Sequence, residues 1–453
     1  MPHRIIIRNA AVITVDDQIG DFSRADILIE DDQIAAVGPD ISVSEAEEVD
    51  AGQMIAIPGL VDTHRHTWQT PLRGIAYDYT LKQYFTTLFD YGAEYRPEDM
   101  YIANLHGALE ALDGGITCML DWNHALNSPD HSDEAIRALK DSGQRAIFAH
   151  GQPAIDFMAH FAESILPHDE DVKRVRQQHF SSDDNLVTMM LAARGADFAT
   201  DETAAEEIRL ARDLGLRITM HSGVGMWGKY QKAVTRMNNM GLLGPDITYI
   251  HANFLSDEEL QMVADTGGSV SVSSKIEMQM GLGDPRTGRL QELGITTCLS
   301  IDTCSGTSGS MFDEMRACVA CERMTRDKGL LAKDIDPEQV ALHSKDVLRM
   351  ATLEGARACG LDHKIGSITP GKQADIVLLR RDMLNIHPVN NLHGAVAMAA
   401  SAQNVDTVFV AGKKVKEGGV LLHHDLAQIF EKTSQTRDYI FDKVGIPNQA
   451  FPV

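Results

Sequence analysis

Cysteine is scarce in this chain, and its scarcity excludes one common way of stabilising a fold. Only six cysteines occur in 453 residues, which is too few for a disulfide framework. Cys318 and Cys321 form a Cys-x-x-Cys pair, in a stretch that we interpret as a helix with both thiols on its packed face. The sequence contains no second cysteine pair that could complete a structural zinc site with them.

The chain also lacks an excess of positive charge and any long apolar run. Its formal net charge of -24 disfavours nucleic acid and anionic membranes as partners. No apolar run approaches the roughly 20 residues of a membrane-spanning helix, and the stretch Ile5–Ile7 is too short for a signal peptide. We therefore expect a cytoplasmic protein without a nucleic-acid or membrane partner.

The remaining composition and the order of patterns along the chain predict a barrel with an added β module. Hydrophobic residues make up 43% of the chain, enough for a large core, and the chain exceeds the roughly 250 residues of a plain α/β barrel. In its middle, short apolar runs alternate with helical stretches such as 101–112, 203–214, 257–265 and 344–358, as expected of βα units. Both flanks contain short β strands, for example Ala25–Ile29 and Ile376–Leu379.

We accordingly predict an α/β protein with three parts. Residues 58–366 form a (β/α)8 barrel of the TIM type. Residues 1–57 and 367–425 together form a small β-sandwich domain, and residues 426–453 form a C-terminal helix and tail.

Two histidines one residue apart follow an apolar run and a proline-glycine turn. In an extended strand, residues such as His64 and His66 point to the same side, so both imidazoles can face one ion. Alone, this pair is equally consistent with two polar residues at a strand end. His221, His251 and Asp302 each follow a further short apolar run. Because the carboxyl ends of barrel strands meet at one rim, these five side chains predict a catalytic zinc or iron site with a position open for water.

On these residues the chain resembles the amidohydrolase superfamily, in the branch that contains cytosine, guanine and S-adenosylhomocysteine deaminases and the triazine hydrolases. The resemblance spans almost the whole chain, up to the stretch 366–377, which matches the family's return to its small β domain. It implies that barrel strand 1 carries the His-x-His pair, that strands 5 and 6 carry His221 and His251, and that strand 8 carries Asp302. We also expect a homo-oligomer, a dimer or larger.

The resemblance further implies one metal ion. Members with two metals usually carry a bridging lysine on strand 4, whereas the stretch 186–193 contains no lysine. We predict one divalent ion, zinc in the first place and iron as the alternative, held by His64, His66, His221 and Asp302. Asp302 would also accept a proton from the activated water. His251 would polarise the reacting centre or orient the water, with the roles of direct ligand or support for Asp302 left open.

One position departs from the family pattern. Ring deaminases of this branch carry a glutamate three residues after the strand 5 histidine, where this chain has Val224, which cannot transfer a proton. Glu277, just beyond strand 7, and His124, at the rim after strand 2, are the candidates to replace it. The alternatives are a solvated Glu277 paired with Lys275 and an ordinary loop histidine at 124.

Three further residues are candidate substrate contacts. Trp68 and Gln69 directly follow the His-x-His pair, and Trp227 follows His221 on another rim loop. The two indoles could form an apolar wall for a flat ligand. Either tryptophan could equally belong to the core.

We therefore predict a metal-dependent hydrolase that cleaves a carbon–nitrogen bond of a small cyclic or amidine-like molecule, with deamination as the first reaction. Hydrolysis of an amide, or of a ring substituent such as chloride, is the alternative, because its leaving group needs less help from a proton donor. The alternative from another class is a non-catalytic barrel that serves assembly. Such a protein is expected to have lost ligands, and this chain keeps all five.

Overall fold

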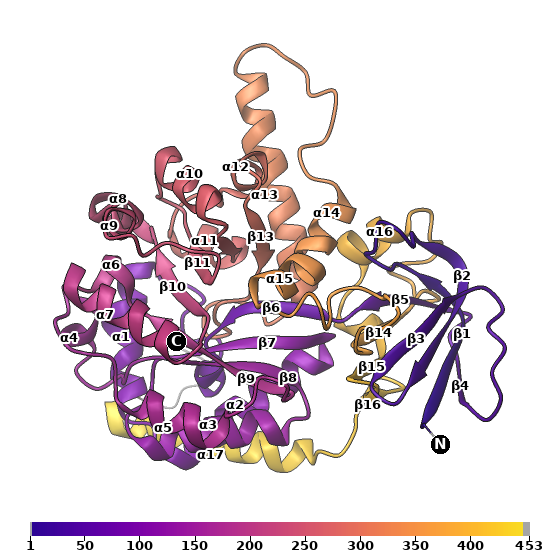
Figure 1. Cartoon of the computed structure of the whole chain (residues 1–453), viewed down its shortest axis with the longest axis horizontal. Coiled ribbons are helices and arrows are strands. Elements are labelled where there is room, and N and C mark those ends of the chain that lie inside the picture. The colour runs from indigo at the N-terminus through magenta and orange to yellow at the C-terminus, as the bar shows by residue number, and fades with distance from the viewer. Residues whose placement is uncertain (1, 447–453) are drawn as a thin grey trace.

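The computed structural model describes residues 2–446 and contains a parallel barrel with a second, mixed sheet beside it (Figure 1). Each barrel strand pairs in parallel with the next strand along the chain. The eight strands are β6 (Leu60–Arg65), β7 (Ile116–Asn123), β8 (Arg145–His150), β9 (Val187–Ala193), β10 (Ile218–Ser222), β11 (Ile247–His251), β12 (Ser269–Val272) and β13 (Thr296–Leu299).

Helices connect these strands and surround the barrel (Figure 1). They include α1 (Leu81–Ala93), α2 (Pro97–Asp113), α3 (Pro129–Asp141), α5 (Asp171–His179), α7 (Asp201–Asp213), α9 (Ala233–Asn239), α10 (Asp257–Thr266), α12 (Thr287–Glu292), α13 (Met311–Leu331), α14 (Ser344–Arg349) and α15 (Gly355–Ala358). A π-helical turn over Met350–Glu354 joins the last two. The predicted helical stretches match these elements, apart from 203–214, which runs one residue past the end of α7, and Cys318 and Cys321 are buried on α13 as expected.

Short elements at the carboxyl rim of the barrel carry much of the site. They are a 3-10 helix over Thr67–Leu72, α4 (Phe157–Phe161), α6 (Gly195–Phe198), α8 (Gly225–Gln231) and α11 (Ser274–Met280). α11 ends at Gly281, whose φ of 72° lies in the left-handed region that favours glycine. These elements place side chains from five different βα connections over one end of the barrel.

The second sheet joins the two ends of the chain, as the sequence predicts. Its strands follow the order β17 (Val420–Leu421), β16 (Lys413–Glu417), β15 (Val405–Val410), β14 (Ile376–Arg380), β5 (Met54–Pro58), β1 (Arg4–Val12), β2 (Phe22–Glu30) and β3 (Gln33–Gly38), with β4 (Glu47–Asp50) paired to β1. Alternate residues serve two cores: Ile376 and Leu378 pack within the module, whereas Val377 and Leu379 join the core of the barrel.

Two further helical segments complete the described chain. Short helical turns occupy Leu392–Gly394, Ala395–Ala399 and Ala402–Asn404, and α17 (Leu426–Val444) packs against α2. On that interface, the Thr433 hydroxyl lies 3.0 Å from His106 Nδ1. The last residues of the predicted C-terminal tail lie outside the described residues. Between residues 2 and 446, no helix combines the length and apolar composition needed to cross a membrane.

A buried ion pair fastens the small module to the barrel. Arg145, at the start of β8, donates from Nε and Nη2 to the two carboxylate oxygens of Asp375, each over 2.9 Å. The Asp375 Oδ1 atom also accepts the backbone N–H of Ala411. Burial disfavours the Arg145 charge, yet the Asp375 charge and hydrogen bonds raise its pKa above the ordinary value. Each charge therefore needs the other.

Breaking this pair tests the link between the two parts. We expect Arg145→Ala to lower the free energy of unfolding by about 3–5 kcal/mol, because it leaves the Asp375 carboxylate buried without its cation. Arg137→Ala breaks the exposed pair of Arg137 with Glu134 and should cost less than about 1 kcal/mol. Denaturant unfolding of both variants measures the difference. Equal losses would show that the buried pair does not couple the module to the barrel.

Candidate active site

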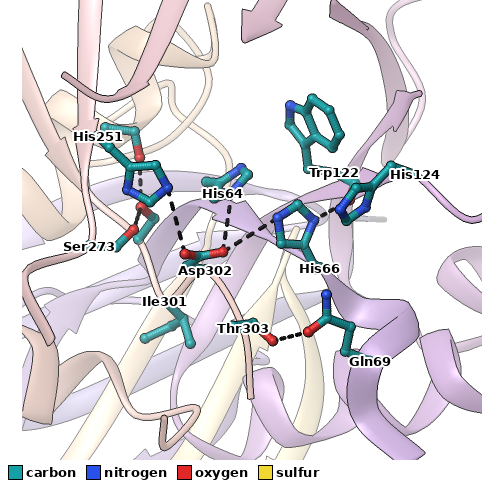
Figure 2. A network of polar contacts seen from close by, with 12 residues as sticks. His64, His66, Gln69, Trp122, His124, His251, Ser273, Ile301, Asp302 and Thr303 are labelled. Carbon is teal, nitrogen blue, oxygen red and sulfur yellow. Dashed lines mark hydrogen bonds and ion pairs between the residues drawn. The ribbon is translucent and has the colours of Figure 1, made fainter. Parts of the chain in front are cut away.

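The four histidines and the aspartate singled out in the sequence converge at the carboxyl rim of the barrel. Figure 2 shows His64, His66, His251 and Asp302 of this set. Asp302 Oδ1 lies 3.4 Å from His64 Nε2 and 3.4 Å from His66 Nε2. Its other oxygen, Oδ2, lies 3.6 Å from His251 Nε2. The rings of His64 and His221 are 4.7 Å apart. Residues separated by more than two hundred positions in the sequence thus meet in one cluster.

The spacing of these atoms fits a metal ion. Two ligands on a tetrahedral zinc ion, each about 2.0–2.1 Å from it, are separated by about 3.3–3.4 Å. In two groups of residues, the potential ligand atoms, one from each residue, all lie within 4.8 Å of one another. These groups are His64 with His66 and Asp302, and His64 with His221 and His251. Both ring nitrogens of His64 are buried and lack a hydrogen-bond partner within residues 2–446. A buried, unpartnered imidazole facing three other candidate ligands suits metal coordination.

Contacts at Nδ1 fix the ring orientations of His66 and His251. His66 Nδ1 lies 2.7 Å from the backbone oxygen of Trp122, which leaves Nε2 facing Asp302. His251 Nδ1 lies 3.1 Å from Glu277 Oε1. Such outer partners set the tautomer of a metal-binding histidine. In both rings the nitrogen available to an ion is Nε2.

The sequence allowed Glu277 to enter the pocket or to lie in solvent beside Lys275, and the structure shows a third arrangement. Glu277 is fully buried, so it is not a solvated charge, and Lys275 instead donates to the Ser308 hydroxyl. Its carboxylate faces His251 and accepts the backbone N–H of Ser273 over 2.8 Å and the side-chain amide of Asn253 over 3.0 Å. Glu277 lines no cavity found at this rim. It therefore acts on the site through His251.

The protonation states of the cluster favour metal binding. Burial, followed by the neighbouring imidazoles, lowers the pKa of His64 and of His221 well below the ordinary histidine value. Burial also lowers the pKa of His66. Burial alone would lower the pKa of His251. Its hydrogen bond to Glu277 and the charge of Asp302 have the larger effect, so the pKa of His251 is raised. Neutral imidazole is the metal-binding form, so the first three histidines are in that form near neutral pH.

His124 and Trp68 form a buried pair next to the cluster. The Trp68 indole N–H donates to His124 Nδ1 over 3.1 Å, so the proton of the neutral His124 ring resides on Nε2. Burial lowers the pKa of His124 well below its ordinary value. His124 lines the cavity at the cluster, where Nε2–H can donate a hydrogen bond. Trp68 is fully buried, lines neither rim cavity and orients His124.

The other two candidate contacts lie in different surroundings. Gln69 is buried: its amide N–H donates to the Tyr84 hydroxyl over 2.6 Å, and its oxygen accepts the Ser305 hydroxyl. The same oxygen accepts the Thr303 hydroxyl (Figure 2). Gln69 ties the loop after Asp302 to the segment after β6. Trp227 is 47% exposed and lines a second cavity farther out, where its indole N–H donates to the Asp197 backbone oxygen.

An inner cavity opens directly above the cluster. Polar groups line its base, and its walls are apolar and include Val224, at the position where a glutamate was expected. An outer cavity of about 1040 Å³ continues from it. The two share the lining residues Leu81, Phe85, Phe89, Phe161, Phe198 and Val224. Of these shared residues, the sequence analysis singled out only Val224, as the position that departs from the family pattern.

This chain belongs to the amidohydrolase family, whose model matches residues 55–415. It is 26% identical over 450 residues to a 5'-deoxyadenosine deaminase from Methanosarcina mazei, covering 97% of this chain and 99% of the relative. In structure it resembles a zinc-bound adenosine deaminase from Xanthomonas campestris (24% identity, TM-score 0.84, 97% and 98% of the two chains). It also resembles a zinc complex of atrazine chlorohydrolase from Arthrobacter aurescens (24% identity, TM-score 0.84, 96% and 100%).

Removing one candidate ligand tests the metal site. We expect His66→Ala to lose zinc far more readily than the unmodified chain, because loss of even an outer partner weakens metal affinity about 10–100-fold. His363, an exposed histidine, provides the matched control His363→Ala, which should keep its metal. Elemental analysis after dialysis against a weak chelator gives the ratio of metal to chain. Equal retention in both variants would remove His66 from the ligand set.

Glu277 can be tested separately from the ligands. We expect Glu277→Gln to keep the metal and to lower kcat about 10–100-fold with little change in KM, because His251 loses the carboxylate that orients it. Glu259→Gln is the control, since Glu259 is another buried glutamate, in the capping box of α10, where glutamine also serves. A variant that loses metal together with activity would instead place Glu277 among the groups that hold the ion.

Proposed function

We propose that this chain is a metal-dependent hydrolase that uses water to cleave a carbon–nitrogen bond of a small cyclic or amidine-like molecule, with ammonia as the first-choice leaving group. The observation that carries this proposal is the convergence of His64, His66, His221, His251 and Asp302 at the base of a cavity. The family membership and the deaminase relatives support it.

We assign the metal ligands and catalytic groups as follows. His64, His66, His221 and Asp302 hold one divalent ion, zinc rather than iron, as in the zinc-bound neighbours of similar fold. When bound, such an ion supplies Lewis acidity and activates water near neutral pH. With the ion in place, Asp302 would accept a proton of the attacking water at a carboxylate oxygen and deliver it to the leaving group. His251, oriented by Glu277, presents Nε2 to the reacting centre.

Substrate contacts divide between donors and apolar walls. His124 donates from Nε2–H to an acceptor on the substrate, since Trp68 occupies Nδ1. Trp227 contributes to the outer wall. Trp68, Gln69 and Glu277 act indirectly: each holds another group of the site in position. Exclusion of water by the apolar walls strengthens every polar contact at the base.

The absence of a proton donor at Val224 favours a second candidate reaction. Val224 lines the inner cavity, at the position where the family resemblance implies a glutamate in ring deaminases. Hydrolysis of an amide or loss of chloride needs less proton transfer to the leaving group. Similarity in fold to an atrazine chlorohydrolase is compatible with this alternative.

Three further assignments belong to the proposal. The functional units are the barrel of residues 58–366, the composite module of residues 1–57 and 367–425, and the C-terminal segment from residue 426. We place the protein in the cytoplasm and expect it to work as a homo-oligomer, a dimer or larger. The negative net charge of -24 supports a small-molecule substrate over nucleic acid.

Metal removal and ammonia release test this function together. The chain treated with a zinc chelator should lose hydrolysis of a panel of aminated heterocycles, amides and chlorinated rings, and zinc should restore it. Ammonia released from an aminated ring supports deamination. Release of an amine or chloride instead selects the second reaction. A zinc-loaded chain that hydrolyses none of the panel would count against both.

Val224 offers a gain-of-function test. We expect Val224→Glu to raise ammonia release from aminated rings about 100-fold or more, within the range of general acid–base catalysis. Glutamine in Val224→Gln has nearly the same size as glutamate, but its amide does not ionise and cannot transfer a proton, so this variant should not raise the rate. If both variants behave alike, proton supply at position 224 does not limit deamination.

A further inference from the structure

The cavity above the metal-binding residues is polar only at its base. The polar lining residues are His66, His221, His251 and Asp302 of the cluster, together with His124, Thr303 and Tyr84. The Tyr84 hydroxyl already accepts a hydrogen bond from Gln69. The groups that can pair with a substrate are thus concentrated where bond cleavage takes place.

The walls of this cavity are apolar and mostly aromatic. Phe85, Phe89, Phe161 and Phe198 line both the inner and the outer cavity, and Phe157 extends the outer one. Their rings are packed together: the ring centroids of Phe89 and Phe157 are 3.3 Å apart and those of Phe157 and Phe161 4.4 Å apart, both pairs stacked. Such walls favour apolar, flat groups.

Charged side chains line the outer cavity at exposed positions. These are Lys82, Asp90 and Asp156, all exposed to solvent. Between this rim and the base, the shared lining of the two cavities consists of Leu81, four phenylalanines and Val224. Among the described residues, therefore, no charged side chain lines the passage where a sugar hydroxyl would need a partner.

We infer that the substrate carries a large apolar substituent, preferably aromatic, next to the bond that is cleaved, and that it is not a nucleoside. This inference rests on the proposed function for the position of the reacting group, and on the lining of the two cavities for the rest. A ribose placed among the phenylalanine rings would lose water from its hydroxyls without gaining hydrogen bonds. An aryl group would bury apolar surface there instead. The chain would then differ from its 5'-deoxyadenosine deaminase relatives in the substituent that it accepts.

A matched pair of ligands tests the inference. Adenosine and 9-benzyladenine share the aminopurine and differ in carrying a ribose or a benzyl group. We expect the zinc-loaded chain to bind 9-benzyladenine at least about tenfold more tightly than adenosine, as measured by isothermal titration calorimetry. Equal affinities, tighter binding of adenosine, or binding of neither ligand would overturn the inference.

Variants locate the site of this preference. Phe161→Ala and the half-buried Phe198→Ala should each weaken 9-benzyladenine binding about fivefold or more and leave adenosine within about twofold. Phe430→Ala, at a 51% exposed position of α17, is the control and should change neither affinity. If one cavity variant fails to fold, as judged by its thermal unfolding transition, the other still decides. If a folded Phe161→Ala or Phe198→Ala variant keeps the same preference for 9-benzyladenine over adenosine, the phenylalanine walls are not its source.

The readouts separate this inference from the proposed function. Binding affinity and ammonia release are two separate readouts, and both are followed for each ligand. Preference for the benzyl compound without hydrolysis would count against the proposed function alone. Hydrolysis of adenosine at a rate equal to or above that of 9-benzyladenine would leave the proposed function standing and overturn the inference about the substituent.

Discussion

Backbone hydrogen bonds between Asp302 and strand β6 hold the site together. The Asp302 N–H donates to the His64 oxygen over 2.9 Å, and the His66 N–H donates to the Asp302 oxygen over 2.7 Å. The N–H of Ile301 donates to the Asp62 carboxylate. These bonds close the barrel seam at its carboxyl end, and they fix the Asp302 carboxylate 3.4 Å from two imidazoles. The bonds that close the seam therefore also bring Asp302 to His64 and His66.

The backbone is strained where function requires it. Asp302 has a φ of 66° and His251 a φ of 75°, in the left-handed region that costs energy for residues other than glycine. These conformations turn both side chains toward His64 at the ends of their strands. The closed seam and the buried Glu277 carboxylate compensate for that strain, because both interactions exist only in the folded barrel. Other non-glycine residues also have a left-handed φ, including Ala252 next to His251 (57°), but Asp302 and His251 are the two that bring a side chain to the cluster.

The sequence predicted the barrel and the five clustered residues because strand ends share one rim, so a histidine after an apolar run is placed by topology alone. It did not predict the direction of side chains within that rim. Glu277 lies 26 residues from His251 and meets it only through the turn into α11. Trp68 reads as a pocket residue beside His66, yet it is buried behind His124. The phenylalanine-lined cavity comes from helices α1, α4 and α6, whose mutual packing no local pattern encodes.

Anomalous diffraction at the zinc edge from crystals of the zinc-loaded chain tests the central claim most directly. The account predicts one strong peak per chain, within about 2.0–2.2 Å of ligand atoms from His64, His66, His221 and Asp302. A peak at another location, or a zinc-loaded crystal without a peak among these residues, would contradict it.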